Sequence, residues 1–178
     1  MLEIWIGLAA SLIVGVLAIV CYAATKPDAF KVTRSQNIAA PAERIYPLIA
    51  NLRQMNTWNP FVKPDPDIKV EYLGPESGVG AKHTWSGNRH VGSGQIAIVE
   101  AAPQNRIAMK LDMLKPMEAH NDVVFTLDEA PGGTAVTWTM TGSQPLLAKV
   151  MSTFFDCDKM VGGMFEQGLR DLKSKAEA

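Results

Sequence analysis

The stretch RIAMKLDMLKPMEAHNDVVFTLDEAPGGTAVTWTMTG, residues 106–142, decides the fold class. Three of its segments, 106–113, 120–128 and 134–142, alternate apolar and polar residues with a period of two, as half-buried strands do. Short connections join them, and Gly132-Gly133 in the second is typical of a hairpin turn. The stretch therefore predicts an antiparallel sheet with one apolar face. That face carries Ile107, Met109, Leu111, Met113, Val123, Phe125, Leu127, Val136, Trp138 and Met140.

The rest of the chain extends this sheet and adds helices. Segments 30–38, 68–73, 81–86 and 91–100 alternate in the same way, which predicts about seven strands. Residues 40–52 favour short helices, kinked or divided at Pro47. Apolar residues recur at helical spacing over 145–173. Gly162 and Gly163 interrupt that helix, which indicates either a break between two helices, or a close approach to the sheet or room for a ligand.

Four pieces of the sequence carry a family resemblance. RSQNIAAPAERIYPLIANLRQMNTWNPF (34–61), GVGAKHTWSGNRHVGSGQI (78–96), GTAVTWTMTG (133–142) and FEQGLRDLKS (165–174) resemble the START-like, or SRPBCC, superfamily and its polyketide cyclase/dehydrase-type branch. The resemblance implies an α+β helix-grip fold over residues 30–176, with a curved antiparallel sheet wrapped on a long C-terminal helix. It also implies a deep hydrophobic cavity that holds lipids, sterols or polyketides. The superfamily shares no catalytic set, so no catalytic residue carries over.

The alternation and the helix-grip arrangement together give candidate cavity residues, although core packing alone would produce the same alternation. The apolar and aromatic candidates are Trp58, Phe61, His83, Trp85, Ile96, Ile98, Met109, Leu111, Val123, Phe125, Trp138, Met151 and Phe154. Trp58 and Phe61 either plug the end of the barrel or form a rim that contacts ligand. Arg34, His83 and Glu100 are the polar candidates, since an ionisable group in a pocket can orient a ligand or move a proton.

The stretch HTWSGNRHVGSGQI, residues 83–96, predicts a hairpin that bears on the cavity. With Asn88-Arg89 as a two-residue turn, Trp85 faces Gly92 and His83 faces Gly94. Each ring then lies across from a residue without a side chain, on the apolar side of the sheet. His83 is therefore predicted to point into the cavity.

The N-terminal region, residues 1–25, reads as a transmembrane anchor, followed by a short linker over 26–29. Ile4 to Thr25 contains no charged residue, and as a helix it is about the length that spans a bilayer core. A cleaved signal peptide is the rival, but the required positive N-terminal region is absent. Lys26, Lys31 and Arg34 follow the helix, which predicts a single-pass protein of the plasma (inner) membrane with its domain in the cytoplasm.

Composition excludes several function classes. The formal net charge is −1 and no basic run occurs, which argues against nucleic acid as a partner. His83, His90 and His120 fall where they would not converge, so we expect no metal site and no cofactor. Cys21 and Cys157 cannot plausibly pair, so we expect no disulfide.

Three functions remain open at this point. The first is a membrane-anchored binding protein for a hydrophobic small molecule, such as a lipid, isoprenoid or polyketide-like compound. The second is a cyclase or hydrolase that acts on a polyketide-like substrate in the same cavity. The third is a protein-interaction or regulatory module whose cavity is filled by its own side chains.

Overall fold

The computed structural model of the chain describes residues 2–178, apart from the side chains of residues 2–4, 6–10 and 157. The helices are α1 (Leu2–Ala24), α2 (Ala42–Ala50), α3 (Leu52–Asn56), α4 (Leu146–Phe154) and α5 (Cys157–Glu177). The strands are β1 (Ala29–Ile38), β2 (Lys69–Leu73), β3 (Lys82–Ser86), β4 (Ser93–Ala102), β5 (Arg106–Lys115), β6 (Ala119–Ala130) and β7 (Gly133–Ser143).

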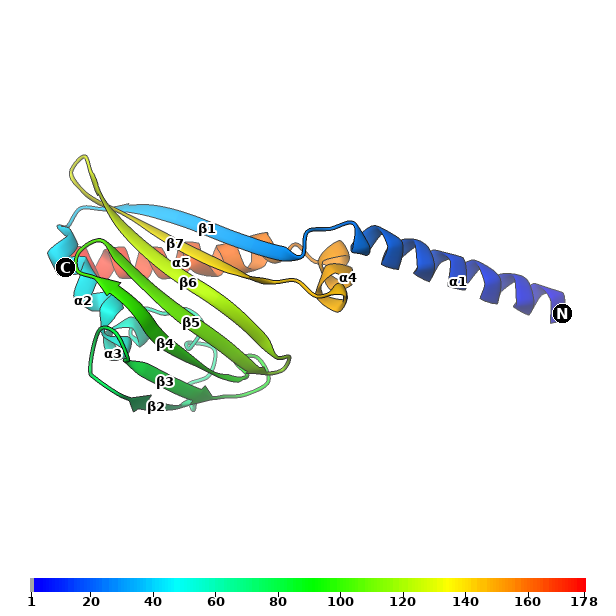
Figure 1. Ribbon diagram of the computed structural model, residues 1–178, viewed down its shortest axis with the longest axis horizontal. Helices are drawn as coiled ribbons and strands as arrows, with labels where there is room; N and C mark the ends of the chain where they lie inside the picture. The colour runs from blue at the N-terminus through cyan, green and yellow to red at the C-terminus, as the bar shows by residue number, and fades with distance from the viewer. Residues whose placement is uncertain (1) are drawn as a thin grey trace.

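The seven strands form one antiparallel sheet in the order β1-β7-β6-β5-β4-β3-β2. Every neighbouring pair except β1 and β7 is joined directly along the chain, so most pairings are local hairpins. The sheet curves, and α5 lies along its concave side beside β1 and β7 (Figure 1). This arrangement confirms the predicted α+β helix-grip fold.

The apolar face of the sheet packs against the helices to form the core. Inward side chains such as Ile107, Phe125 and Val136 are fully buried, as the period-two alternation predicted. Phe165 and Leu169 of α5 cover them from the concave side and are also buried. Burial of this apolar surface is the main stabilising contribution to the fold.

Two short helices follow β1, but the chain divides at Asn51 and not at Pro47. Pro47 lies inside α2, near its C-terminal end. The Asn51 side chain accepts hydrogen bonds from the backbone N–H groups of Arg53 and Gln54, and so caps α3. An N-cap asparagine starts a new helix axis, which explains why the break falls there.

The C-terminal helical region is also interrupted at a different position from the predicted one. Phe155 and Asp156 separate α4 from α5, and the Asp156 side chain caps α5 by accepting from the backbone N–H of Lys159. Gly162 and Gly163 lie inside α5. A Cβ on Gly162 would lie 2.0 Å from Nη2 of Arg34, so this glycine permits a close approach between helix and sheet.

The β3–β4 hairpin has a longer turn than predicted. Ser86 pairs with Ser93, and the Asn88 side chain accepts from the backbone N–H groups of His90 and Val91, which stabilises a wider loop. The register therefore moves by two residues: Trp85 pairs with Gly94, and His83 pairs with Ile96. A shift of two keeps each side chain on its predicted face.

Helix α1 extends away from the domain, and its own C-terminal end lies beside α4 (Figure 1). Exposed apolar side chains run along it, including Leu12, Val14 and Leu17. Within the described residues, however, no helix contains a run long and apolar enough to cross a membrane. The structure therefore does not support the transmembrane helix predicted from the sequence.

Candidate functional site

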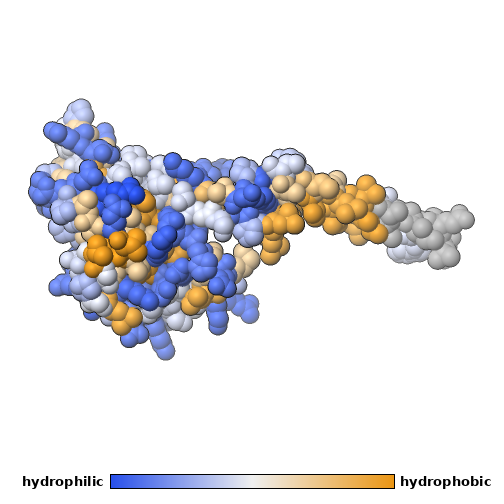
Figure 2. All heavy atoms as spheres, viewed as in Figure 1, coloured by the Kyte–Doolittle hydropathy of each residue, from blue (hydrophilic) through white to orange (hydrophobic). Residues whose placement is uncertain are grey.

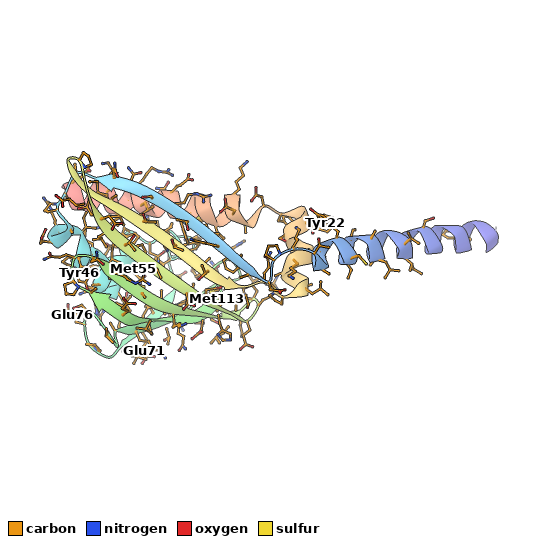
Figure 3. The ribbon with its side chains drawn as sticks, turned by 45° about the horizontal axis from the view of Figure 1, so that its top comes forward. Tyr22, Tyr46, Met55, Glu71, Glu76 and Met113 are labelled. Atoms are coloured by element: carbon orange, nitrogen blue, oxygen red, sulfur yellow. The ribbon has the colours of Figure 1, made fainter. Side chains whose placement is uncertain are left out.

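A cavity of about 260 Å³ lies between the sheet, α3 and the first half of α5. Figure 3 labels two of its lining residues, Met55 on α3 and Met113 near the β5–β6 turn. His90 is exposed and Val91 is partly exposed, so the lining reaches the surface at the β3–β4 loop. The lining also includes Asn59, Phe61, Val62, His83, Trp85, Ile96, Leu111, Asn121, Val123, Trp138, Met140, Val161 and Phe165.

The candidate residues from the sequence fall into three groups. Phe61, His83, Trp85, Ile96, Leu111, Val123 and Trp138 line the cavity. Trp58, Ile98, Met109 and Phe125 are buried in the core outside the lining. Met151 and Phe154 lie exposed on α4, because the helix break at Phe155 turns α4 away from the concave face. These two residues were wrongly placed in the cavity.

Trp58 and Phe61 therefore have different positions within one short segment. Trp58 is fully buried, and its Nε1–H donates to the carbonyl oxygen of Leu48 at 2.9 Å. Its ring packs edge-on against Phe125 and Trp138. Phe61 is exposed, lines the cavity and packs edge-on against Trp138 and Phe165. The segment is thus core at one end and cavity wall at the other.

Arg34 lies outside the cavity, contrary to the prediction. It faces the concave side, but the N-terminal part of α5 covers it, and its guanidinium binds Asp158 and Glu166 at 2.9 Å each. The guanidinium lowers the pKa of the Asp158 carboxyl below its usual range by hydrogen bonding. Arg34 holds α5 to β1, with Gly162 providing the space for its head group.

Glu100 also lies outside the cavity, because a β-bulge interrupts the alternation. The pairing between β4 and β5 shifts between Ile98 and Glu100, so that Ala101 takes the place opposite Ile107. Glu100 turns outward and accepts a hydrogen bond from Nε of Arg106 at 3.1 Å. Of the three polar candidates, His83 alone lines the cavity.

His83 is buried, with 4 % of its surface exposed. Its Nδ1 lies 2.9 Å from Nδ2 of Asn56, and its ring packs against those of Tyr72 and Trp85. Burial lowers the pKa of His83 from 6.5 to about 4, because the charged imidazolium would lose its hydration. His83 is therefore neutral at pH 7.

Two lining residues hold buried polar atoms without hydrogen-bond partners. In the described part of the chain, the buried side-chain atoms that lack a partner are Oδ1 of Asn121 and Nε1 of Trp138. Both residues line the cavity. Buried polar atoms are nearly always paired in native proteins, because an unpaired one costs about 1–3 kcal/mol. Both atoms are covered by neighbouring protein atoms, and Oδ1 of Asn121 faces Gly142 of β7, so they belong to the packing behind the cavity wall.

The other two histidines have different positions. His90 lines the same cavity as His83 where the lining reaches the surface at the β3–β4 loop, and His120 is on the outer face of β6. Nδ1 of His120 lies 2.7 Å from Oδ1 of Asp112, and this hydrogen bond raises the pKa of His120. Among the described residues, no three His, Cys, Asp or Glu side chains lie together as metal ligands would.

Sequence reasoning missed several lining residues, and one signal was available for some of them. Met113 and Met140 were placed on the apolar face but not named as cavity residues, and Asn121 shares the parity of that face, so the period of two was the available signal. Met55 and Asn59 come from α3 and the turn after it, and nothing local in the sequence fixes where that segment packs. Whether Val161 and Phe165 face the cavity depends on where α5 begins, and the sequence placed the break between α4 and α5 at another position.

A curved antiparallel sheet that grips a C-terminal helix, with a mostly apolar cavity between them, defines the helix-grip fold. The chain belongs to the family described as "Polyketide cyclase / dehydrase and lipid transport", which matches residues 29–177. No curated protein matches the chain significantly.

Solved structures show the same fold at low sequence identity. The protein CV1439 from Chromobacterium violaceum is 16% identical, with a TM-score of 0.60 over 86% of this chain and 99% of that one. The Aha1 dimer from Colwellia psychrerythraea is 16% identical, with a TM-score of 0.58 over 83% and 96%. The di-domain ARO/CYC BexL from the BE-7585A biosynthetic pathway is 20% identical, with a TM-score of 0.63 over 89% of this chain and 53% of that one.

Proposed function

We propose that the protein binds a small hydrophobic molecule in the cavity between the sheet and α5. The observation that carries this proposal is the cavity lining, which is mostly apolar and aromatic and includes a few polar side chains, among them His83 and Asn59. A mostly apolar pocket with a few polar groups is the usual form of a small-molecule site. The open volume of about 260 Å³ argues against a module whose cavity its own side chains fill.

The arrangement favours binding over catalysis. Arg34 and Glu100 lie outside the cavity, paired with Asp158 and Arg106. His83, with its pKa lowered to about 4, is a weak base at neutral pH. A cyclase or hydrolase would need an acid or base near the reacting carbon. We therefore place binding first and the enzyme second.

Mass spectrometry of the natively purified full-length protein tests this function. A hydrophobic small molecule should appear in the organic extract of the wild type. Leu111→Trp, which fills the cavity, should lose it, whereas Val99→Trp on the exposed outer side of β4 should retain it. A wild type that carries no such molecule, or one that Leu111→Trp still carries, would contradict the proposal.

We further propose that α1 attaches the protein to a lipid membrane, with the domain in the cytoplasm. The support is the apolar surface of α1, which Figure 2 shows as a hydrophobic band over the coloured part of the helix, beyond the mostly hydrophilic domain. Exposed Leu147 and Phe154 continue that surface on α4, next to the end of α1. Apolar surface of this extent on one side of a protein commonly marks a membrane or protein contact.

Membrane fractionation tests this attachment. The wild type should sediment with membranes, and the variant Val14→Glu/Leu17→Glu should be released. A matched variant, Leu73→Glu/Val99→Glu, adds two charges at exposed apolar positions of the sheet and should stay with the membrane. Equal sedimentation of the wild type and the Val14→Glu/Leu17→Glu variant would refute the role of α1.

A further inference from the structure

A chain of hydrogen bonds fixes which nitrogen of His83 carries the proton. The backbone N–H of Phe61 can only donate, and it donates to Oδ1 of Asn59 at 3.1 Å. This places Nδ2 of Asn59 toward Oδ1 of Asn56, at 3.4 Å. Nδ2 of Asn56 then faces Nδ1 of His83 at 2.9 Å, and it also donates to the Tyr72 hydroxyl at 2.9 Å. Because an amide nitrogen donates, Nδ1 of His83 accepts.

The neutral ring of His83 therefore carries its proton on Nε2. Burial keeps the ring neutral, since it lowers the pKa to about 4. Among the described residues, none accepts a hydrogen bond from Nε2 of His83. His83 lines the cavity, so this N–H is a donor held in place by Asn56 and still without an acceptor.

The charge of the lining restricts what the acceptor can be. In the described chain, the cavity lining contains no Asp, Glu, Lys or Arg side chain. An anion in such a cavity would lose its hydration without gaining a counter-ion, which is costly. A neutral oxygen needs only the hydrogen bond. The lining thus disfavours fatty acids and phosphates and suits a carbonyl group.

We propose that Nε2–H of His83 donates a hydrogen bond to the carbonyl oxygen of a neutral, largely apolar ligand, of the ketone, quinone or ester class. This inference rests on the proposed binding function and names the ligand class for the same cavity. Asn56 acts as a positioning residue, because its amide holds the proton of His83 on Nε2.

Two probes of nearly equal shape isolate this hydrogen bond. Fluorene and 9-fluorenone share one ring frame and differ by a CH2 group in place of the carbonyl. Isothermal titration calorimetry on the full-length protein gives the ratio of their affinities. Leu111→Trp fills the cavity, so any binding that this variant retains occurs elsewhere on the chain. His120→Phe makes the same substitution on the outer face of the sheet and is the matched control for His83→Phe.

The expected result is a change in that ratio at His83 alone. His83→Phe should reduce the preference for fluorenone over fluorene by roughly threefold to tenfold, which is the net value of one hydrogen bond. Its affinity for fluorene should stay within about twofold, and His120→Phe should leave the ratio unchanged. An unchanged ratio in His83→Phe overturns the inference but leaves hydrophobic binding intact. If neither probe binds the wild type in the cavity, the proposed function fails, and this inference fails with it.

Nitrogen-15 NMR of the wild type gives an independent measurement that requires no variant. His83 should show the Nε2–H tautomer at pH 7, and fluorenone should shift its Hε2 resonance downfield more than fluorene does. A proton on Nδ1, or equal shifts from the two probes, would overturn the inference even if His83→Phe fails to fold.

Discussion

Replacing Gly94 with alanine should destabilise the protein strongly, because the added methyl group has no space. Gly94 lies on β4 between Trp85 of β3 and Met113 of β5. A Cβ there would lie 2.4 Å from the backbone oxygen of Asp112 and 2.7 Å from the six-membered ring of Trp85. The Trp85 ring could move into the cavity. The Asp112 oxygen can move only with strand β5.

The cost follows from this difference between a movable ring and a fixed strand. An overpacked core position costs typically about 1–3 kcal/mol, and a clash with backbone belongs at the upper end. About 3 kcal/mol lowers the Tm of a domain of this size by roughly 6–12 °C. Gly163→Ala is the matched control, since no atom lies within 4 Å of its added Cβ. That change should stabilise α5 by about 1 kcal/mol.

Thermal denaturation by circular dichroism checks both substitutions. The double variant Gly94→Ala/Trp85→Leu should recover only part of the loss, measured against Trp85→Leu alone, because the contact with Asp112 remains. A Tm for Gly94→Ala within about 2 °C of the wild type would refute the reasoning. Complete recovery in the double variant would show that Trp85, and not the backbone of β5, sets the cost.

Three more predictions concern titration and packing. The folded-state pKa of His83, about 4, lies below its ordinary 6.5, so the unfolded chain binds more protons in between. Stability should therefore fall by up to about 3 kcal/mol as pH drops from 6.5 toward 4. Urea denaturation should show that His83→Phe lacks this slope. The pKa of His120 is raised by its hydrogen bond with Asp112, so its stabilisation is present below pH 6.5 and lost at higher pH. His120→Gln should thus have a lower Tm than the wild type at pH 5.5 and an equal Tm at pH 9. Gly162→Ala should destabilise the wild type, because its Cβ would displace the guanidinium of Arg34. In an Arg34→Ala background the same change should stabilise α5, and a destabilising effect in both backgrounds would contradict this account.

The sheet could be predicted because its signal is local. Alternation in each strand reports the face that it buries, and short turn sequences report the hairpin partners. The details that failed depend on contacts between distant residues. The bulge after Ile98, which turned Glu100 outward, arises from the pairing of β4 with β5. Alternation in β4 alone contains no sign of it.

The candidate site was predicted in part for the same reason. The strand residues His83, Trp85, Leu111 and Trp138 were found by their parity, and they line the cavity. The cavity residues that lie on helices were not predicted, because tertiary contacts set the break after Phe154 and the packing of Met55. The donor role of His83 required the amide chain through Asn56, which links α3 to β3.

The joint between α1 and the domain has a mechanical consequence. The Asp28 carboxylate binds Nζ of Lys149, and its backbone oxygen accepts from the N–H of Gln144. Nζ of Lys26 also donates to Oγ of Ser152. Two bonds thus fasten the four-residue connection to α4, and a third fastens it to Gln144 just before α4, so the connection cannot rotate freely. A pull or tilt applied to α1 would be delivered as torque to α4, and through it to the start of α5 beside the cavity.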